Sequence, residues 1–157
     1  ISEMAVRKRG ILLVEDDPVQ GLVYQSALSR LSSEISITNN VEDAVRIFAR
    51  SSLSLCIVDL GIYLAGNTYD KKGGLNFLEQ AKAINPSIPL IVLSATRDPE
   101  ILLPCFEAGC HDYILKTEGF EQAVDRLEYW IRSYPYDMPE LESRKEKVIS
   151  ALKRESK

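Results

Sequence analysis

The sequence predicts an α/β protein built on a doubly wound, five-stranded parallel sheet, with one further helix at the C-terminus. Short apolar segments alternate five times with segments of helical period, so the chain reads as (βα)5. Strands that alternate with helices favour a parallel sheet with helices on both faces. The segment 53–59 contains the continuous apolar run Leu-Cys-Ile-Val, typical of a strand buried on both faces, and it ends in Asp59.

The first helix is expected after a strand at 10–14. Asp17 is a suitable N-cap and Pro18 suits the first helical position. Apolar residues then recur at helical spacing, which predicts a helix. These residues are Val19, Leu22, Val23, Ala27 and Leu31.

The other strands and helices follow the same patterns. The remaining strands are expected at 35–37, 53–59, 89–94 and 113–116. Further helices are expected over 41–48 and 75–84, from 98 onward, and over 117–134. Asn40 and Thr117 are the predicted caps of the second and the fifth helix. Pro104 falls inside the fourth helix, where its missing backbone donor should kink the helix or leave only a short turn before it.

Two segments lie outside this repeat. Residues 61–74 show no period, and a loop of this length is usually functional or mobile. Residues 140–157 form a charged helical segment that either frays in solvent or docks on the domain or on a second copy. Its apolar anchors are Leu141, Val148, Ile149 and Leu152. The expected organisation is an N-terminal extension at 1–9, a domain at 10–134 and a C-terminal helical extension at 135–157.

The composition is that of a globular protein, with 45% hydrophobic and 27% charged residues. A net charge of −4 argues against a nucleic-acid-binding surface. No apolar run is long enough to span a bilayer, and the first ten residues lack the apolar segment of a signal peptide. Cys56, Cys105 and Cys110 match no metal spacing, which favours free thiols in a reducing cytoplasm. His111 is the only histidine, and we expect it to be structural.

Polar residues follow four of the predicted strands. Glu15 and Asp16 follow the first strand, Asp59 ends the third, and Ser94 and Lys116 end the fourth and fifth. Because parallel strands end at the same edge of a sheet, these groups should share one small surface. Clustered carboxylates suit Mg²⁺, whereas a lysine and a hydroxyl suit phosphate oxygens. These are the groups needed to hold a phosphoryl group while a carboxylate attacks it.

Four segments together resemble the receiver domain of two-component response regulators. They are Ile-Leu-Leu-Val-Glu-Asp-Asp-Pro at 11–18, Ile-Val-Asp-Leu at 57–60, Val-Leu-Ser-Ala at 92–95 and Asp-Tyr-Ile-Leu-Lys at 112–116. The resemblance spans roughly 10–133. Each motif alone is weak, but all four in order and at suitable spacing are a strong signal. The resemblance implies a flavodoxin-like (βα)5 fold.

By this resemblance, Asp59 is the phosphoacceptor, and Mg²⁺ is the cofactor. Asp59 would take a phosphoryl group from the phosphohistidine of a sensor histidine kinase or a histidine phosphotransfer protein, or from a small phosphodonor. The implied metal ligands are Asp16, Asp59, the backbone carbonyl of Gly61, and Glu15 through a water. Asp17 is better interpreted as a helix cap than as a ligand.

The resemblance also implies a switch. Ser94 and Lys116 would contact the phosphoryl oxygens, and Tyr113 matches the aromatic residue whose rotamer follows the state of Ser94. A surface made by the fourth helix, fifth strand and fifth helix would then shift and be recognised by a downstream protein. Such a chain is not an enzyme beyond its own phosphorylation and dephosphorylation. Thr117, where the family usually has proline, the long segment 61–74 and Pro104 depart from the family pattern and leave the output partner open.

Three other interpretations are weaker. An interaction module with the same fold would not need phosphorylation, but the intact set of site residues favours phosphorylation. An aspartyl phosphatase typically has a second Asp two residues after its nucleophile, where this chain has Gly61. A nucleotide-binding protein of this fold would have a glycine-rich loop after the first strand. A homodimer through the fourth and fifth helices or through the tail stays open, as do the cognate kinase, the signal and the phosphoryl lifetime.

Overall fold

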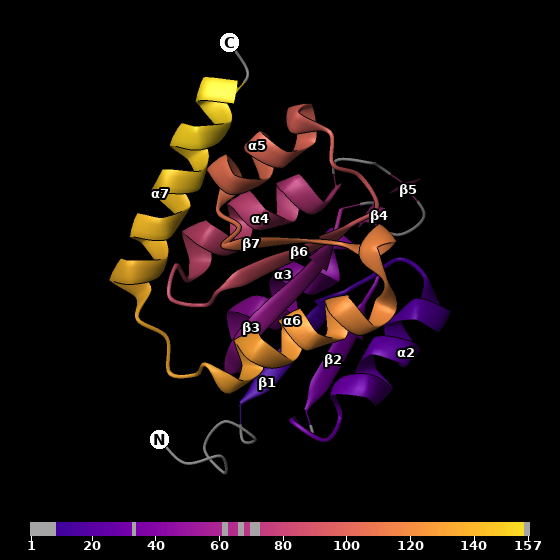
Figure 1. Cartoon of the computed structure of the whole chain (residues 1–157). Coiled ribbons are helices and arrows are strands. Elements are labelled where there is room, and N and C mark those ends of the chain that lie inside the picture. Colours follow the sequence, from indigo (N-terminus) through magenta and orange to yellow (C-terminus); the bar gives the residue numbers. More distant parts are fainter. Residues whose placement is uncertain (1–8, 33, 61–62, 66–67, 70–72, 156–157) are drawn as a thin grey trace.

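The computed structural model confirms the doubly wound α/β fold (Figure 1). It describes residues 9–32, 34–60, 63–65, 68–69 and 73–155. One sheet has five parallel strands in the order β2-β1-β3-β6-β7. These strands are β1 (Gly10–Val14), β2 (Ile35–Thr38), β3 (Leu53–Asp59), β6 (Leu90–Ser94) and β7 (Asp112–Leu115).

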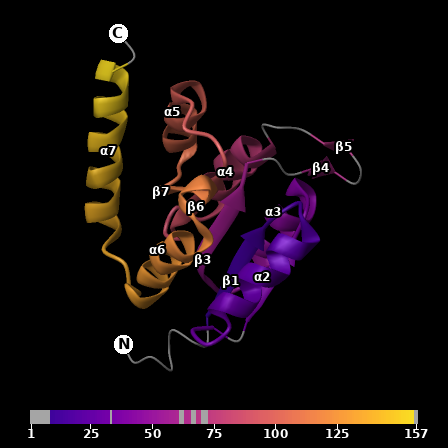
Figure 2. The same cartoon turned by 45° about the vertical axis from the view of Figure 1, so that its right-hand side comes forward.

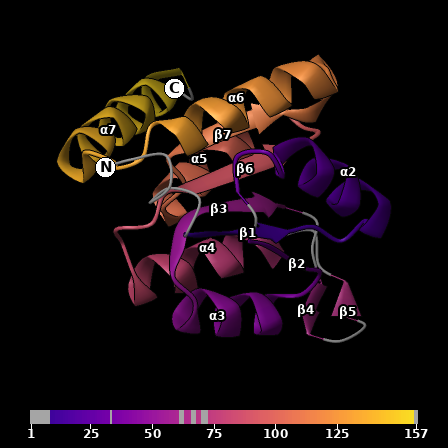
Figure 3. The ribbon, with the colours of Figure 1, turned by 90° about the horizontal axis from the view of Figure 1, so that it is seen from below.

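Helices cover both faces of this sheet (Figure 3). One face carries α2 (Pro18–Leu28) and α6 (Phe120–Arg132). The other face carries α3 (Val41–Arg50), α4 (Gly73–Ile84) and α5 (Pro99–Ala108). The predicted cap of α3 is confirmed, because the Asn40 side chain accepts a hydrogen bond from the Asp43 amide at 2.8 Å.

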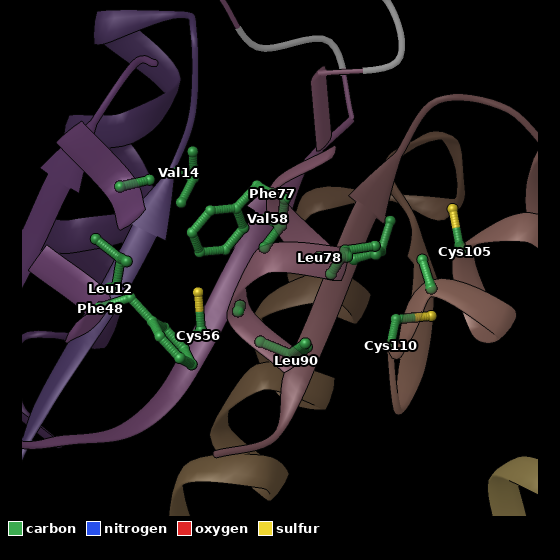
Figure 4. Close-up of a cluster of buried hydrophobic side chains, with 14 of the residues drawn as sticks. Leu12, Val14, Phe48, Cys56, Val58, Phe77, Leu78, Leu90, Cys105 and Cys110 are labelled. Atoms are coloured by element: carbon green, nitrogen blue, oxygen red, sulfur yellow. The ribbon is translucent and has the colours of Figure 1, made fainter. Parts of the chain in front are cut away.

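The central strand β3 joins the two cores. All seven of its residues are buried, as its continuous apolar run predicts. Its side chains alternate between the faces: Leu55 and Ile57 pack under α2 and α6, whereas Cys56 and Val58 pack under α3 and α4. Figure 4 shows the second of these cores, with Phe77 of α4 against Val58. The strand therefore delivers Asp59 to the sheet edge from a rigid position.

The helix predicted after the first strand is confirmed as α2, but most of the apolar residues that recur at helical spacing in it are not buried. Val19, Leu22 and Val23 are 69%, 60% and 45% exposed, whereas Gly21, Tyr24 and Leu28 face the sheet. Gly21 explains the rotation, because a Cβ there would lie 3.1 Å from Ile37 Cγ2, so that the helix approaches β2 closely at this point. The cap is as predicted, since Asp17 Oδ1 accepts hydrogen bonds from the Val19 and Gln20 amides. The helix thus leaves an apolar strip in solvent.

Two local predictions after β6 are corrected. Of the two effects predicted for Pro104, the short turn is wrong, because α5 runs from Pro99 to Ala108, and the kink stays a prediction. A proline removes only one backbone donor, and Asp98 caps the helix by accepting from the Glu100 amide. Thr117 is not a cap: it lies within the 3₁₀ turn η1 (Lys116–Glu118), and α6 begins at Phe120. The residue between them, Gly119, has a φ of 120°, which favours glycine.

The segment 61–74 contains secondary structure that its lack of period did not predict. Within its described residues, β4 (Tyr63–Ala65) pairs antiparallel with β5 (Thr68–Tyr69). Helix α4 then begins at Gly73, two residues before the first expected apolar position. A Cβ on Gly74 would lie 2.7 Å from Leu60 Cα, so this glycine lets α4 start directly against the end of β3.

The C-terminal segment forms α7 (Met138–Glu155), which lies beside α5 (Figures 1 and 2). Ile149 is buried and Leu152 packs against the same core, while Leu141 packs near α6. Val148 is not an anchor, because it is 38% exposed. Docking on the domain is therefore correct and fraying is wrong. No helix in the described part of the chain is long and apolar enough to cross a membrane.

Candidate functional site

The structure brings the predicted polar residues to the carboxyl edge of the sheet. Glu15 follows β1, Asp59 ends β3, Ser94 ends β6 and Lys116 follows β7. Lys116 Nζ donates a hydrogen bond to Asp59 Oδ2 and lies 3.4 Å from Glu15 Oε1. The parallel strands explain this meeting of residues that are up to 101 positions apart.

Three carboxylates form a compact acidic cluster here. Glu15, Asp16 and Asp59 each offer an oxygen, and these oxygens all lie within 4.8 Å of one another. Glu15 Oε2 is buried and accepts no hydrogen bond from any described residue. Hard divalent cations such as Mg²⁺ prefer such oxygen ligands, so these side chains fit the ion. Gly61, whose backbone carbonyl completes the predicted ligand set, lies outside the described residues.

The cluster has more negative charge than one lysine can balance. Burial, together with the hydrogen bond and charge of Asp59, raises the pKa of Glu15 to about 9. Burial and the charge of Asp59 also raise the pKa of Asp16. Burial works to lower the pKa of Lys116, but the hydrogen bond and charge of Asp59 outweigh it and raise that pKa. A second cation at this position would relieve the repulsion between the carboxylates.

Gln20 is a member of the site that the sequence analysis missed. Its side-chain oxygen accepts a hydrogen bond from Lys116 Nζ at 3.0 Å. Gln20 lies three residues after the cap Asp17, in the first turn of α2, and this position is the only sequence signal for it. Lys116 is thereby held by acceptors from β1, α2 and β3.

Ser94 and Tyr113 meet through the loop after β6. The Thr96 amide donates to Ser94 Oγ at 3.2 Å, and the Tyr113 hydroxyl donates to the Thr96 carbonyl at 2.6 Å. Burial raises the pKa of Tyr113, although its hydrogen bond with Ser94 works to lower it. The two residues that the resemblance pairs as a switch are therefore neighbours in space.

An apolar surface adjoins the site. It runs along the exposed side of α2 and across to the start of α6, and we call it the α2–Phe120 surface. Its members are Val19, Leu22, Val23, Ser26, Ala27 and Phe120. The Phe120 ring lies 5.2 Å from the Tyr24 ring, and Gln20 on the same helix reaches Lys116. Apolar residues grouped in this way on the surface are a candidate for contact with another protein.

Comparisons with known proteins identify the domain. The family model of the response regulator receiver domain matches residues 11–128. The transcriptional regulatory protein RprY of Bacteroides fragilis is 29% identical over 125 residues, which are 80% of this chain and 50% of that protein. The transcriptional regulatory protein MalR of Bacillus subtilis is 29% identical over 114 residues, 71% of this chain and 46% of that protein. The chain spans about half the length of these curated relatives.

Solved structures show the same fold. A CheY-like response regulator receiver domain protein from Methanospirillum hungatei has a TM-score of 0.66 at 18% identity, covering 87% of this chain and 98% of that one. A response regulator from Thermotoga maritima has a TM-score of 0.64 at 23% identity, covering 80% and 98%. Since the family model matches most of the sequence, this chain belongs to the response regulator receiver domain family.

Proposed function

We propose that this chain is a phosphorylation-switched receiver in which Asp59 accepts the phosphoryl group. The observation that carries the proposal is the position of Asp59, paired with Lys116 inside a cluster of three carboxylates. An Asp59 oxygen attacks the phosphorus of a phosphohistidine, an acyl phosphate bond forms, and the bond from phosphorus to the imidazole nitrogen breaks. The donor is a sensor histidine kinase or a histidine phosphotransfer protein.

The neighbouring residues have distinct roles in this reaction. Lys116 orients the Asp59 carboxylate before transfer and then binds a phosphoryl oxygen. Asp16 and Asp59 would hold Mg²⁺ directly and Glu15 through a water, and the ion would supply positive charge beside the phosphoryl oxygens. The Ser94 hydroxyl donates to another phosphoryl oxygen. Gly61 stays a prediction as a metal ligand.

The α2–Phe120 surface supports a protein as the phosphodonor. A phosphohistidine on a folded protein has to approach Asp59 across the residues around Lys116. Val23 and Phe120 present exposed apolar area beside that approach, and they are 45% and 43% exposed. We propose that the donor packs on this surface while its phosphohistidine reaches Asp59.

The proposed organisation keeps a receiver domain at 10–134, with extensions at 1–9 and 135–157. Receiver domains are generally not classed as enzymes, and this one would act only on its own phosphorylation state. The two relatives are transcriptional regulators by name and about twice as long as the match. For this chain we propose a downstream protein partner and no nucleic acid or membrane. The cytoplasmic location and a homodimer stay predictions.

Intact mass spectrometry tests this function. The protein is incubated with Mg²⁺ and acetyl phosphate, beside Asp59→Asn and the control Asp125→Asn, which changes an exposed carboxylate on α6. We expect one Mg²⁺-dependent phosphoryl adduct in the wild type and the control, and none in Asp59→Asn. If acetyl phosphate gives no adduct, a phosphorylated phosphotransfer protein is tried. Failure with both donors would favour an interaction module that keeps the fold without phosphorylation.

A further inference from the structure

Helix α7 lies outside the matched residues 11–128, yet it is built into the domain. Ile149 is 9% exposed and belongs to the same core as Cys105, Phe106 and Ala108 of α5. Leu152 packs on this core one turn later. One side of α5 is thus covered by the C-terminal helix of the same chain (Figure 2).

A buried polar network fixes the start of α7. Glu142 accepts from His111 Nε2 at 2.9 Å and from Lys145 Nζ at 2.5 Å. The side chains of His111 and Lys145 are only 3% and 4% exposed. His111 Nδ1 accepts from the Leu90 amide, so its other ring nitrogen has the proton that reaches Glu142. Such a network needs one arrangement, because a displaced α7 would leave the buried groups without partners.

The other end of α5 rests on a chain of hydrogen bonds that begins at Ser94. The Thr96 amide donates to Ser94 Oγ at 3.2 Å, and the Asp98 amide donates to Thr96 Oγ1 at 3.0 Å. Asp98 Oδ1 in turn accepts from the Glu100 amide at 2.9 Å and caps α5. Three successive side-chain contacts therefore connect the site edge to the first turn of α5. We call this chain the Ser94–Asp98 relay.

Tyr113 of β7 contacts the same loop. Its hydroxyl donates to the Thr96 carbonyl, and its ring packs on the core that includes Leu102 and Leu103 of α5. Since Ile149 and Leu152 of α7 pack on this core as well, α5 lies between the Ser94 end of the site and α7. A displacement of the loop 94–98 would therefore move α5 and, with it, the residues on which α7 packs.

We propose that the side of α5 covered by α7 is an interaction surface, and that phosphorylation of Asp59 loosens α7 through the Ser94–Asp98 relay. The inference rests on the proposed function, because it requires Ser94 to turn to a phosphoryl oxygen. The Thr96 amide then loses its acceptor, the loop shifts, and the cap of α5 weakens. By linkage, the docked α7 opposes phosphorylation to the same extent.

Hydrogen exchange of the full chain, read by mass spectrometry, tests the inference. The amides of α7 are followed with Mg²⁺ and acetyl phosphate, and the intact mass of each sample reports the fraction phosphorylated. We expect exchange in α7 to accelerate about 5-fold or more in the phosphorylated protein, the lower end of usual coupling. An adduct with unchanged exchange in α7 would overturn the inference and leave the proposed function standing.

A second arm tests the relay without phosphorylation. Thr96→Val keeps the shape of the side chain but removes the acceptor of the Asp98 amide. Ser29→Ala is the matched control, since it removes a hydroxyl that bonds the Ser26 carbonyl at the far end of α2. We expect α7 to exchange faster in Thr96→Val than in the control. Equal exchange in the two variants would refute the relay, whatever acetyl phosphate does.

Discussion

Gly74→Ala places a methyl group against the backbone that carries the phosphoacceptor. The new Cβ would lie 2.7 Å from Leu60 Cα and 3.0 Å from the Asp59 carbonyl oxygen. The Gly74 amide also donates to the Leu60 carbonyl at 3.1 Å, so the two segments are joined at this point. Backbone atoms cannot rotate away as a side chain can. Either α4 or the end of β3 has to move.

The expected net loss of stability follows from two opposed effects. Overpacking typically costs about 1–3 kcal/mol. Alanine regains up to about 1 kcal/mol over glycine in a helix. The contact with backbone atoms places the cost in the upper half of the overpacking range, about 2–3 kcal/mol. The net loss is therefore about 1–3 kcal/mol, which lowers the Tm of a domain of this size by about 2–12 °C. Because Asp59 is displaced with its backbone, we also expect slower phosphorylation by acetyl phosphate.

The control is Gly21→Ala, made in another helix. Its Cβ would meet the Ile37 Cγ2 methyl at 3.1 Å, a side-chain contact that needs an adjustment of only a few tenths of an ångström. Thermal unfolding followed by circular dichroism and the rate of adduct formation are measured for both variants. We expect the control to stay near wild type in both assays. A Gly74→Ala protein as stable and as quickly phosphorylated as the control would refute the close-packing argument.

Three further outcomes are expected. Val23→Asp should slow phosphoryl transfer from a phosphorylated phosphotransfer protein at least several-fold and leave the rate of phosphorylation by acetyl phosphate unchanged. Ile84→Asp, a control of similar exposure on α4, should change neither rate. Equal slowing with both donors would contradict a docking role. Ile149→Ala should lower the free energy of unfolding by about 2 kcal/mol, which is the low end for a buried isoleucine. It should also raise the fraction of protein that is phosphorylated, and an unchanged fraction would argue against coupling between phosphorylation and the docking of α7. Burial lowers the pKa of His111 from 6.5, so the unfolded chain binds more protons at this residue, and the contribution of His111 to stability falls as pH drops below about 6.5. Urea titrations of wild type and His111→Gln from pH 7.5 to 5 should show that wild type loses stability relative to the variant as pH drops. A difference between the two proteins that does not change with pH would exclude this role of His111.

The pH prediction depends on every group that faces His111. Glu142 and Lys145 contact it from α7, and Lys82 acts on it from α4. The pKa of Glu142 is lowered, because hydrogen bonds from Lys145 and His111 outweigh its partial burial. Glu142 thus titrates below its usual value of 4.5, outside the window of the measurement. Glu15 and Asp16 also make stability depend on pH, because their pKa values are raised, but they are the same in both proteins. The difference between wild type and His111→Gln from pH 7.5 to 5 therefore reports the histidine.

The strand ends were predictable from sequence because they depend on one robust rule. A continuous apolar run gives a buried strand, and parallel strands end at one edge. That rule alone brings Asp59, Glu15 and Lys116 together. It uses no information about which residues touch, and so it could not reveal Gln20, which reaches Lys116 from a helix.

The face of α2 could not be predicted in the same way. Val19, Leu22 and Val23 have the helical spacing of a core stripe, but the same spacing suits a surface that binds another protein. The structure shows that these residues are exposed, because Gly21 allows close packing on the other side of the helix that no apolar period indicates. Similarly, the docking of α7 depends on the contact of His111 with Glu142, which are 31 residues apart. Contacts of this kind are set by tertiary packing.

The central claim is that Asp59 is the residue that carries the phosphoryl group. The most direct measurement is to phosphorylate the protein with a phosphorylated phosphotransfer protein and Mg²⁺, reduce the product with borohydride, and locate the modified residue by peptide mass spectrometry. Borohydride converts an aspartyl phosphate to homoserine. The account predicts homoserine at position 59 alone. Homoserine at Asp16, or at any other aspartate in place of Asp59, would contradict it.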